Sequence, residues 1–164
     1  MSKKEFIDSK ILKSSEISSK LAVWNFKSKK IVFTNGVFDL LHLGHIDYLS
    51  KAKDLGDILV IGVNSDVSAK RLGKGSNRPI TNELSRSTLI AALGFVDAVI
   101  LFDEDTPYNL IKVVQPDVLV KGADYKPEEI VGYDVVTAKG GKIETIEFLE
   151  GYSTTKIENK IKEI

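Results

Sequence analysis

The most informative stretch of this 164-residue chain reads Lys30-Ile-Val-Phe-Thr-Asn-Gly-Val-Phe-Asp-Leu-Leu-His-Leu-Gly-His45. It opens with a short apolar run, 30–34, which ends in Asn35-Gly36, a pair typical of turns. The run therefore predicts a buried strand. Residues 45–55 then carry apolar side chains at helical spacing, and Gly56 is a stop signal. We expect a strand that passes through a turn into a helix.

The same alternation continues to the C-terminus. Apolar runs predict further strands at 57–63, 96–101, 117–120 and 142–148. Helices are predicted from Asn82 onward, at 106–114 with Thr106-Pro107 as its cap, after Pro127, and at 153–161. Residues 65–79 are predicted to form a polar loop, with room for a helical turn. Apolar strands that alternate with helices predict a parallel sheet covered on both faces. With right-handed crossovers, this is a doubly wound, Rossmann-like α/β fold.

The chain is predicted to consist of an N-terminal helical extension, residues 1–28, and one main domain, residues 29–164. The extension is polar and rich in Lys and Ser. Ile17, Leu21, Trp24 and Phe26 form an apolar stripe that predicts a helix packed on the domain. A domain of this length can bury enough surface to be stable without disulfides.

The composition argues against several function classes. Lys plus Arg equals Asp plus Glu, at 23 each, so bulk charge gives no reason to expect nucleic acid or a membrane surface as a partner. No apolar run approaches ~18 residues, so no membrane span is expected, and the polar start of the chain predicts no signal peptide. The chain has no cysteine, which rules out thiolate metal sites and suits the cytoplasm.

Ligands of doubly wound sheets bind beyond the carboxyl ends of the strands. Segments 34–45, 64–74, 121–125 and 152–156 are predicted to meet there. The only histidines of the chain, in His42-Leu-Gly-His45, open the first crossover helix. Unpaired N–H groups and the helix dipole favour a phosphate at that point. Gly44 permits close approach of the backbone, and both imidazoles can donate hydrogen bonds to phosphate oxygens.

Two other roles for the histidines stay open. A histidine at a helix start is often a cap or a surface residue. A metal site is disfavoured, because no third ligand of ordinary type accompanies the pair. Two histidines that flank a glycine directly after an apolar strand favour the phosphate role.

Three motifs resemble the signatures of a known family. Gly36-Val-Phe-Asp39, His42-Leu-Gly-His45 and Gly151-Tyr-Ser-Thr-Thr-Lys-Ile157 are similar to those of the cytidylyltransferase-like nucleotidyltransferases. The resemblance implies that 29–164 is a nucleotidyltransferase domain in which a substrate phosphate attacks the α-phosphorus of a nucleoside triphosphate in line. It also implies release of pyrophosphate, no covalent enzyme intermediate, and Mg²⁺ held mainly through the triphosphate, with no direct protein ligand.

The resemblance and the residue chemistry together assign roles to side chains. The expected catalytic residues are His42, His45, Lys74 and Arg86. The expected nucleotide-binding residues are Thr34, Asn35, Gly36, Phe38, Gly44, His45, Lys121, Gly122, Asp124, Ser153, Thr154 and Thr155. The expected substrate-binding residues are Asp39, Asn64, Arg71 and Arg78.

Several of these residues have an equally good structural role. Asp39 can brace its loop, and Asp124 can stabilise a turn. Phe38 suits the core. One of the hydroxyl residues at 153–155 is expected to cap the last helix, and the basic residues at 70–78 can be simply solvated.

Longer motifs narrow the resemblance. Val63-Asn-Ser-Asp66, Asp105-Thr-Pro107, Pro116-Asp-Val-Leu-Val-Lys-Gly-Ala-Asp-Tyr125 and Ser153-Thr-Thr155 resemble the D-glycero-β-D-manno-heptose 1-phosphate adenylyltransferases. This implies transfer of AMP from ATP to a sugar 1-phosphate, giving ADP-heptose for lipopolysaccharide core biosynthesis, by a stand-alone form that lacks the often fused kinase. Phe148-Leu-Glu-Gly151 replaces the Arg-Thr-Glu-Gly usual in cytidylyltransferases, which favours ATP over CTP.

Two alternatives remain. The nearest is a CTP-dependent cytidylyltransferase that acts on glycerol 3-phosphate or a similar phosphorylated alcohol. The other is a non-catalytic nucleotide-binding module, which is disfavoured because binding alone does not require two imidazoles.

Apolar surface on the extension or on 126–135 can also form a homodimer.

Overall fold

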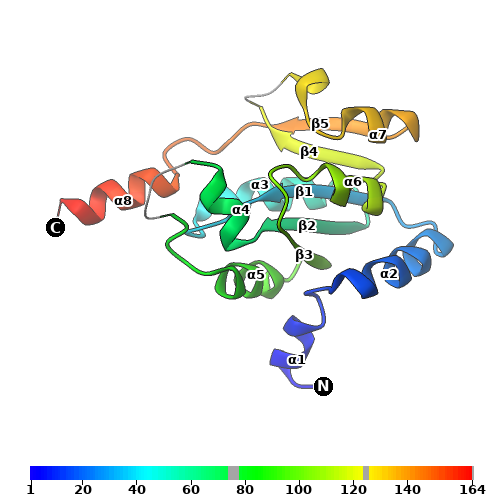
Figure 1. The fold of residues 1–164 in the computed structure, drawn as a ribbon, viewed down its shortest axis with the longest axis horizontal. Coiled ribbons are helices and arrows are strands. Elements are labelled where there is room, and N and C mark those ends of the chain that lie inside the picture. Colours follow the sequence, from blue (N-terminus) through cyan, green and yellow to red (C-terminus); the bar gives the residue numbers. More distant parts are fainter. Residues whose placement is uncertain (74–77, 124–125, 164) are drawn as a thin grey trace.

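The computed structural model describes residues 1–73, 78–123 and 126–163, and its centre is a parallel sheet between two layers of helices (Figure 1). The strands are β1 (Ile31–Gly36), β2 (Ile58–Asn64), β3 (Ala98–Phe102), β4 (Val118–Gly122) and β5 (Lys142–Ile146). Neighbouring strands all pair in parallel, in the order β3-β2-β1-β4-β5. The doubly wound α/β fold predicted from the sequence is confirmed.

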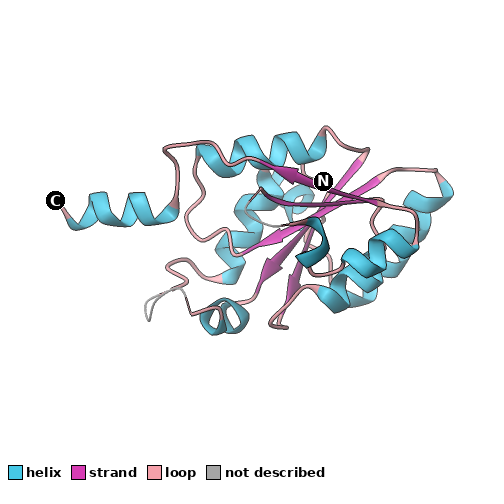
Figure 2. Cartoon of the chain, turned by 90° about the horizontal axis from the view of Figure 1, so that it is seen from above, coloured by secondary structure: helices cyan, strands magenta, loops and turns pink. Residues whose placement is uncertain are grey.

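Helices cover both faces of the sheet (Figures 1 and 2). On one face lie α3 (Leu43–Lys53) and α5 (Glu83–Ala92), and on the other lie α2 (Ser14–Phe26), α6 (Tyr108–Val114) and α7 (Tyr133–Ala138). The remaining helical elements are α1 (Lys3–Asp8), α4 (Asp66–Arg71), the 3-10 turn η1 (Pro127–Glu129) and α8 (Thr154–Lys162).

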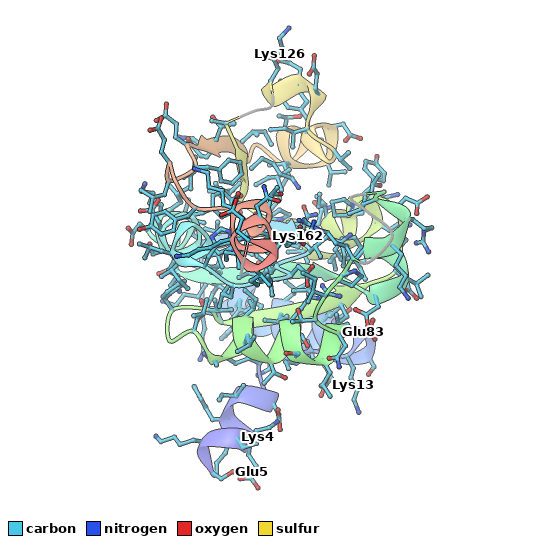
Figure 3. All side chains as sticks on the ribbon, turned by 90° about the vertical axis from the view of Figure 1, so that its left-hand side faces the viewer. Lys4, Glu5, Lys13, Glu83, Lys126 and Lys162 are labelled. Atoms are coloured by element: carbon cyan, nitrogen blue, oxygen red, sulfur yellow. The ribbon has the colours of Figure 1, made fainter. Side chains whose placement is uncertain are left out.

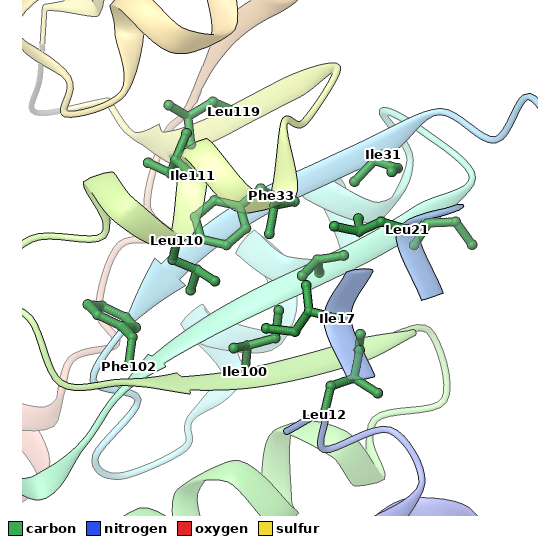
Figure 4. Packing of buried hydrophobic residues seen from close by; sticks show 14 of the residues in the cluster. Leu12, Ile17, Leu21, Ile31, Phe33, Ile100, Phe102, Leu110, Ile111 and Leu119 are labelled. Atoms are coloured by element: carbon green, nitrogen blue, oxygen red, sulfur yellow. The ribbon is translucent and has the colours of Figure 1, made fainter. Parts of the chain in front are cut away.

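Successive residues of each strand face opposite layers, as the pleat requires. In β1, Phe33 packs against Leu110 and Ile111 of α6 (Figure 4), whereas Val32 belongs to the cluster that contains Leu49 of α3. Because both faces are buried, the strands are apolar throughout instead of alternating between apolar and polar residues.

The order of the strands reverses beside β1. From β1 the chain moves outward through β2 to β3, and it then returns to the other side of β1 to form β4 and β5. Crossovers therefore leave β1 and β4 in opposite directions, and the carboxyl ends of these two strands form the switch point at which ligands of such sheets bind.

The N-terminal region differs from the single helix that was predicted. It contains α1 and α2, and between them Ile11 bridges to Val99 of the edge strand β3. Leu12, Ile17 and Leu21 lie in the core cluster shown in Figure 4, whereas α1, with Lys4 and Glu5, projects from the body (Figure 3). The domain boundary at residue 28 stays a prediction.

The loop predicted at 65–79 contains the helical turn that the sequence allowed for, α4, whose first turn is capped by the Ser65 hydroxyl, which accepts from Ser68 N (3.0 Å). Three local predictions need correction. The helix predicted after Pro127 is two elements, η1 and α7. Pro107, without a side-chain hydrogen bond, precedes α6 in place of a Thr106 cap. Strand β5 ends at Ile146, so that Phe148 lies outside the sheet.

No helix in the described part of the chain combines the length and the apolar character needed to cross a membrane.

Candidate active site

A cavity of about 520 Å³ opens at the switch point. Its walls come from the carboxyl ends of three strands: Asn35 and Gly36 of β1, Asn64 of β2, and Lys121 and Gly122 of β4. The volume is in the range of pockets that hold a small ligand. Predicted segments 34–45, 64–74, 121–125 and 152–156 each contribute at least one lining residue, so the sequence placed the site at the correct edge of the sheet.

The histidine pair lies at the N-terminus of α3. His42 is the N-cap residue, with an extended backbone (φ −139°, ψ 170°). The two imidazoles stack, with ring centroids 3.8 Å apart and planes 20° apart. His45 lines the cavity, and His42 lies behind it, where its Nδ1 atom is buried and accepts no hydrogen bond from the described residues. The two rings thus lie together at the first turn of α3.

Both imidazoles are neutral near pH 7. Burial, together with the neighbouring His42, lowers the pKa of His45 to about 4, and burial also lowers the pKa of His42. The backbone N–H of His42 donates to Nδ1 of His45 over 3.4 Å. Because Nδ1 is the acceptor, Nε2 carries the proton of the neutral His45 ring. His45 is therefore a neutral hydrogen-bond donor at the edge of the cavity.

Gly44 permits the close approach of the surrounding groups. A Cβ atom there would lie 3.1 Å from Nδ1 of His42 and 3.2 Å from Cβ of Tyr152. A side chain at this position would displace either the histidine or the segment that leads into α8. The packing at Gly44 thus joins the helix N-terminus to the start of α8.

Lys121 supplies a positive charge to the cavity. Its ammonium donates to Oδ1 of Asn35, and burial lowers its pKa to about 8. It forms no ion pair with a carboxylate of the described residues. A buried cation without a counter-ion is costly, so the site favours an anionic ligand.

Asp39 braces the loop that faces the histidines. Its carboxylate accepts from the backbone N–H groups of Ile80 (2.9 Å) and Thr81 (2.8 Å). The bracing role considered for it from the sequence is confirmed, although Asp39 also lines the cavity. Phe38 packs in the core, and its ring meets His45 edge-on, with centroids 5.4 Å apart.

Arg86 does not reach the cavity. It is 1% exposed, and its guanidinium donates to the carbonyl oxygens of Val37 (2.6 Å) and Thr81 (3.0 Å) and to Asp66 Oδ1 (2.8 Å). The side chain lies on the buried face of α5, where it ties the β1–α3 loop to α4. The structure thus gives Arg86 positioning contacts in place of the expected contact with a triphosphate.

Three other predicted residues lie in three different settings: at the cavity, outside its lining and in the core. Arg78 lines the cavity and pairs with Glu158 of α8 (2.5 Å). Arg71 lies outside the cavity lining, where it pairs with Asp105 (2.5 Å). Thr34 is fully buried, and its hydroxyl bonds to Tyr48 Oη (2.8 Å), so its side chain belongs to the core instead of a phosphate cradle.

Among the hydroxyl residues at the start of α8, one caps the helix and another lines the cavity. Ser153 caps the helix by accepting from Lys156 N (3.2 Å). Thr154 lines the cavity, and Thr155 Oγ1 accepts from Arg78 (3.4 Å).

Asn64 lines the cavity while it donates to Ser68 Oγ (2.9 Å). Lys74 and Asp124 lie outside the described residues.

The cavity also contains residues that the sequence did not assign to it. They are Tyr48, Pro79, Asp105, Pro107 and Phe148, which all lie outside the predicted segments. Tyr48 follows His45 by one helical turn, so helical periodicity was a usable signal for it. For Phe148, the usable signal was the departure of Phe148-Leu-Glu-Gly151 from the Arg-Thr-Glu-Gly usual in cytidylyltransferases.

Comparison with known proteins identifies the family. The model of the cytidylyltransferase-like family matches residues 33–160. The chain belongs to the cytidylyltransferase-like family. The resemblance stated from the three motifs is thereby confirmed.

Several proteins are similar to this cytidylyltransferase-like chain. The bifunctional protein HldE of Campylobacter jejuni subsp. doylei is 57% identical over 137 residues, which are 84% of this chain and 29% of that protein. The bifunctional protein HldE of Citrifermentans bemidjiense is 51% identical over 154 residues, which are 94% of this chain and 31% of that protein. The chain thus spans less than a third of the length of these curated relatives.

Two solved structures share the fold of the cytidylyltransferase-like chain. A lipopolysaccharide core biosynthesis protein from Thermoplasma volcanium has a TM-score of 0.60 and 34% identity, covering 76% of this chain and 99% of that chain. The pantoate-beta-alanine ligase of Francisella tularensis has a TM-score of 0.56, covering 94% of this chain and 78% of that chain, and its 20% identity supports a likeness of fold alone.

Proposed function

We propose that the chain transfers AMP from ATP to D-glycero-β-D-manno-heptose 1-phosphate and so forms ADP-heptose and pyrophosphate for lipopolysaccharide core biosynthesis. The observation that carries the proposal is the stacked, neutral histidine pair at the start of α3, with His45 at the edge of the cavity. The acceptor is supported by the heptose-adenylyltransferase motifs and by the similarity to a protein named for lipopolysaccharide core biosynthesis.

The reaction is an in-line displacement at phosphorus. An oxygen of the sugar phosphate forms a bond to the α-phosphorus of ATP, and the bond from that phosphorus to the bridging oxygen of the β-phosphate breaks. The bonding electrons leave with pyrophosphate. The displacement takes place in one step, so no covalent enzyme intermediate is needed. Such chemistry depends on positioning and on stabilisation of the charge that builds up on the phosphate oxygens.

The residues of the cavity suit these tasks. The Nε2–H of His45 donates to an α-phosphate oxygen, and stacked His42 holds the ring in place. The N–H groups at the start of α3 face the same phosphate and need no reorganisation during the reaction. The Lys121 ammonium adds charge stabilisation from the opposite wall, on β4.

Mg²⁺ fits this site as a partner of the triphosphate. The described residues contain no group of three or more His, Asp and Glu side chains that could hold a metal by themselves. Of the carboxylates in the cavity lining, Asp39 is engaged by two backbone N–H groups and Asp105 pairs with Arg71, so the metal would be held mainly through the triphosphate. Mg²⁺ is typically held by one or two carboxylates and by phosphate oxygens. When bound, it would neutralise charge on the triphosphate.

The test is a pyrophosphate-release assay with Mg²⁺, in which ATP and CTP are each combined with heptose 1-phosphate and with glycerol 3-phosphate. Release from ATP with the heptose phosphate alone is the expected result. Release from CTP with glycerol 3-phosphate would keep the mechanism and overturn both substrates. Binding of ATP without release from any pair would instead support a non-catalytic nucleotide-binding module.

Location and assembly are separate parts of the proposal. We propose a cytoplasmic location, because ATP is kept inside the cell. A homodimer stays a prediction, which light scattering of the purified chain can test.

A further inference from the structure

Phe148 is an aromatic residue held at the wall of the cavity. It follows β5 by two positions, lines the cavity, and is 53% exposed. A phenylalanine that leaves this much apolar surface in water gains little from burial. The exposed part of the ring is therefore available to a ligand in the cavity.

Two neighbours fix the ring. The ring tip lies so close to Gly122 that a Cβ atom on this glycine would overlap with it. The ring of Tyr48 lies beside it, with centroids 5.7 Å apart and planes 37° apart. Tyr48 is in turn held by the hydroxyl of Thr34, at 2.8 Å. The ring is thus positioned by side-chain and backbone contacts and still presents surface to the cavity.

Phe148 shares the cavity with His45, and Tyr48 connects the two. Tyr48 lies three residues after His45 on α3, a rise of roughly one helical turn, and Phe148 lies against Tyr48. In a nucleotide, the ribose separates the base from the α-phosphate. His45, Phe148, Thr154 and Lys121 line the same cavity, so a nucleotide whose α-phosphate is at His45 can place its base toward Phe148.

We propose that the ring of Phe148 is the surface on which the adenine of ATP stacks, and that it favours a purine over a pyrimidine nucleotide. The inference rests on the proposed function for the choice of ATP. An adenine overlaps more of a phenyl ring than a cytosine does, and stacking needs no base-specific hydrogen bond because every base has a π-face. Gly122 acts through Phe148 as a positioning residue, because its missing side chain makes room for the ring.

The test measures binding and not turnover. Isothermal titration calorimetry with Mg²⁺-ATP, Mg²⁺-CTP and inorganic tripolyphosphate is carried out on the unmodified protein, on Phe148→Ala and on Phe148→Trp. Phe26→Ala is the matched control, because Phe26 is 90% exposed at the end of α2, away from the cavity. Loss of a base–aromatic stack is expected to raise the Kd of ATP by roughly tenfold in Phe148→Ala.

Three further results are expected. Phe148→Trp keeps the affinity for ATP, and Phe26→Ala changes no Kd. Tripolyphosphate, which has no base, binds Phe148→Ala as well as it binds the unmodified protein. The ratio of the Kd for CTP to the Kd for ATP is smaller in Phe148→Ala than in the unmodified protein. An unchanged Kd for ATP, an equal loss of ATP and tripolyphosphate binding, or no ATP binding by the unmodified protein would each overturn the proposal.

A double-mutant cycle separates positioning from folding. Gly122→Ala is expected to weaken ATP binding by displacing the ring, and the effect should largely disappear when Phe148 is already Ala. Additive losses would show that Gly122 does not act through Phe148. None of these binding measurements includes an acceptor. A failure of pyrophosphate release would therefore leave this inference intact. A failure of the binding measurements would leave the transfer reaction intact.

Discussion

The two ends of the parallel sheet carry charged residues that are arranged in opposite ways. At the amino end, three aspartates each accept a backbone N–H from a neighbouring strand or its start and each pair with a lysine. The sets are Asp57 with Lys30 N (2.9 Å) and Lys29 (3.4 Å), Asp97 with Leu59 N (2.7 Å) and Lys53 (2.6 Å), and Asp117 with Ile31 N (2.8 Å) and Lys139 (2.9 Å).

At the carboxyl end, three titratable groups lack a carboxylate partner among the described residues, although Arg78 pairs with Glu158 and Arg71 with Asp105. His42, His45 and Lys121 all have pKa values lowered by burial, and none pairs with a carboxylate of the described residues. The aspartate–lysine pairs at the amino end fix the register of the strands, whereas the carboxyl end holds groups whose partners must come from a ligand. Substitutions at the two ends should therefore affect different properties.

The largest effect is expected for His45→Ala, at the carboxyl end. Removal of a preorganised donor to the α-phosphate should lower kcat of pyrophosphate release by about 10²–10³-fold. Lys51→Ala is the matched control, since Lys51 lies on the same helix and pairs with Asp47 at the surface (2.7 Å). The two variants should unfold at similar temperatures, and a fall in kcat of less than about tenfold in His45→Ala would contradict the proposed role.

A smaller effect, on stability alone, is expected for Asp97→Ala at the amino end. The buried N–H of Leu59 would lose its acceptor, so the free energy of unfolding in urea should fall by about 1–3 kcal/mol. Asp97→Asn should lose less, because an amide oxygen can still accept from Leu59. Both variants should keep kcat while folded; a fall in kcat without a fall in stability would show that the two ends are coupled.

The smallest effect concerns the pH dependence of ATP binding. The ammonium of Lys121 loses its proton near its pKa of about 8, so the affinity for Mg²⁺-ATP should fall about fivefold between about pH 7 and about pH 9. Lys121→Met should bind more weakly at the lower pH and show no such fall. Equal pH profiles for the two proteins in calorimetry would remove Lys121 from the phosphate site.

Stability should change with pH in the opposite direction. The unfolded lysine keeps its proton up to about pH 10.4, whereas the folded one loses it near about pH 8, so the unfolded state binds more protons in this window. The free energy of unfolding, relative to Lys121→Met, should therefore rise between these two pH values.

The elements with strong local patterns were predictable. Apolar runs that alternate with helical spacing predicted the parallel sheet, and the histidine motif after the first strand predicted the position of the phosphate site. Asn82 and Ser153 act as helix caps as expected, with their side chains accepting from Ser85 N (2.8 Å) and Lys156 N (3.2 Å). Each of these features depends on neighbours within a few residues, so the sequence contains the relevant information.

The direction of individual side chains was not predictable in the same way. Arg86 and Lys121 are both basic residues near the same edge of the sheet, and only Lys121 faces the cavity. Arg86 turns inward because the carbonyl oxygens of Val37 and Thr81 and the carboxylate of Asp66 converge on it from distant parts of the chain. No local pattern in the sequence reveals that convergence.

The sequence by itself determined the α/β class, the edge of the sheet that carries the cavity and the identity of the histidine pair, because hydrophobic periodicity and short motifs act over a few residues. Only the tertiary structure decided which candidates share the cavity. It turned Arg86 and Thr34 into the interior, lowered the pKa of His45 to about 4 by burial, and held Phe148 against Gly122. These properties arise from contacts between residues far apart in the chain, which exist only once the sheet and its two helical layers have packed.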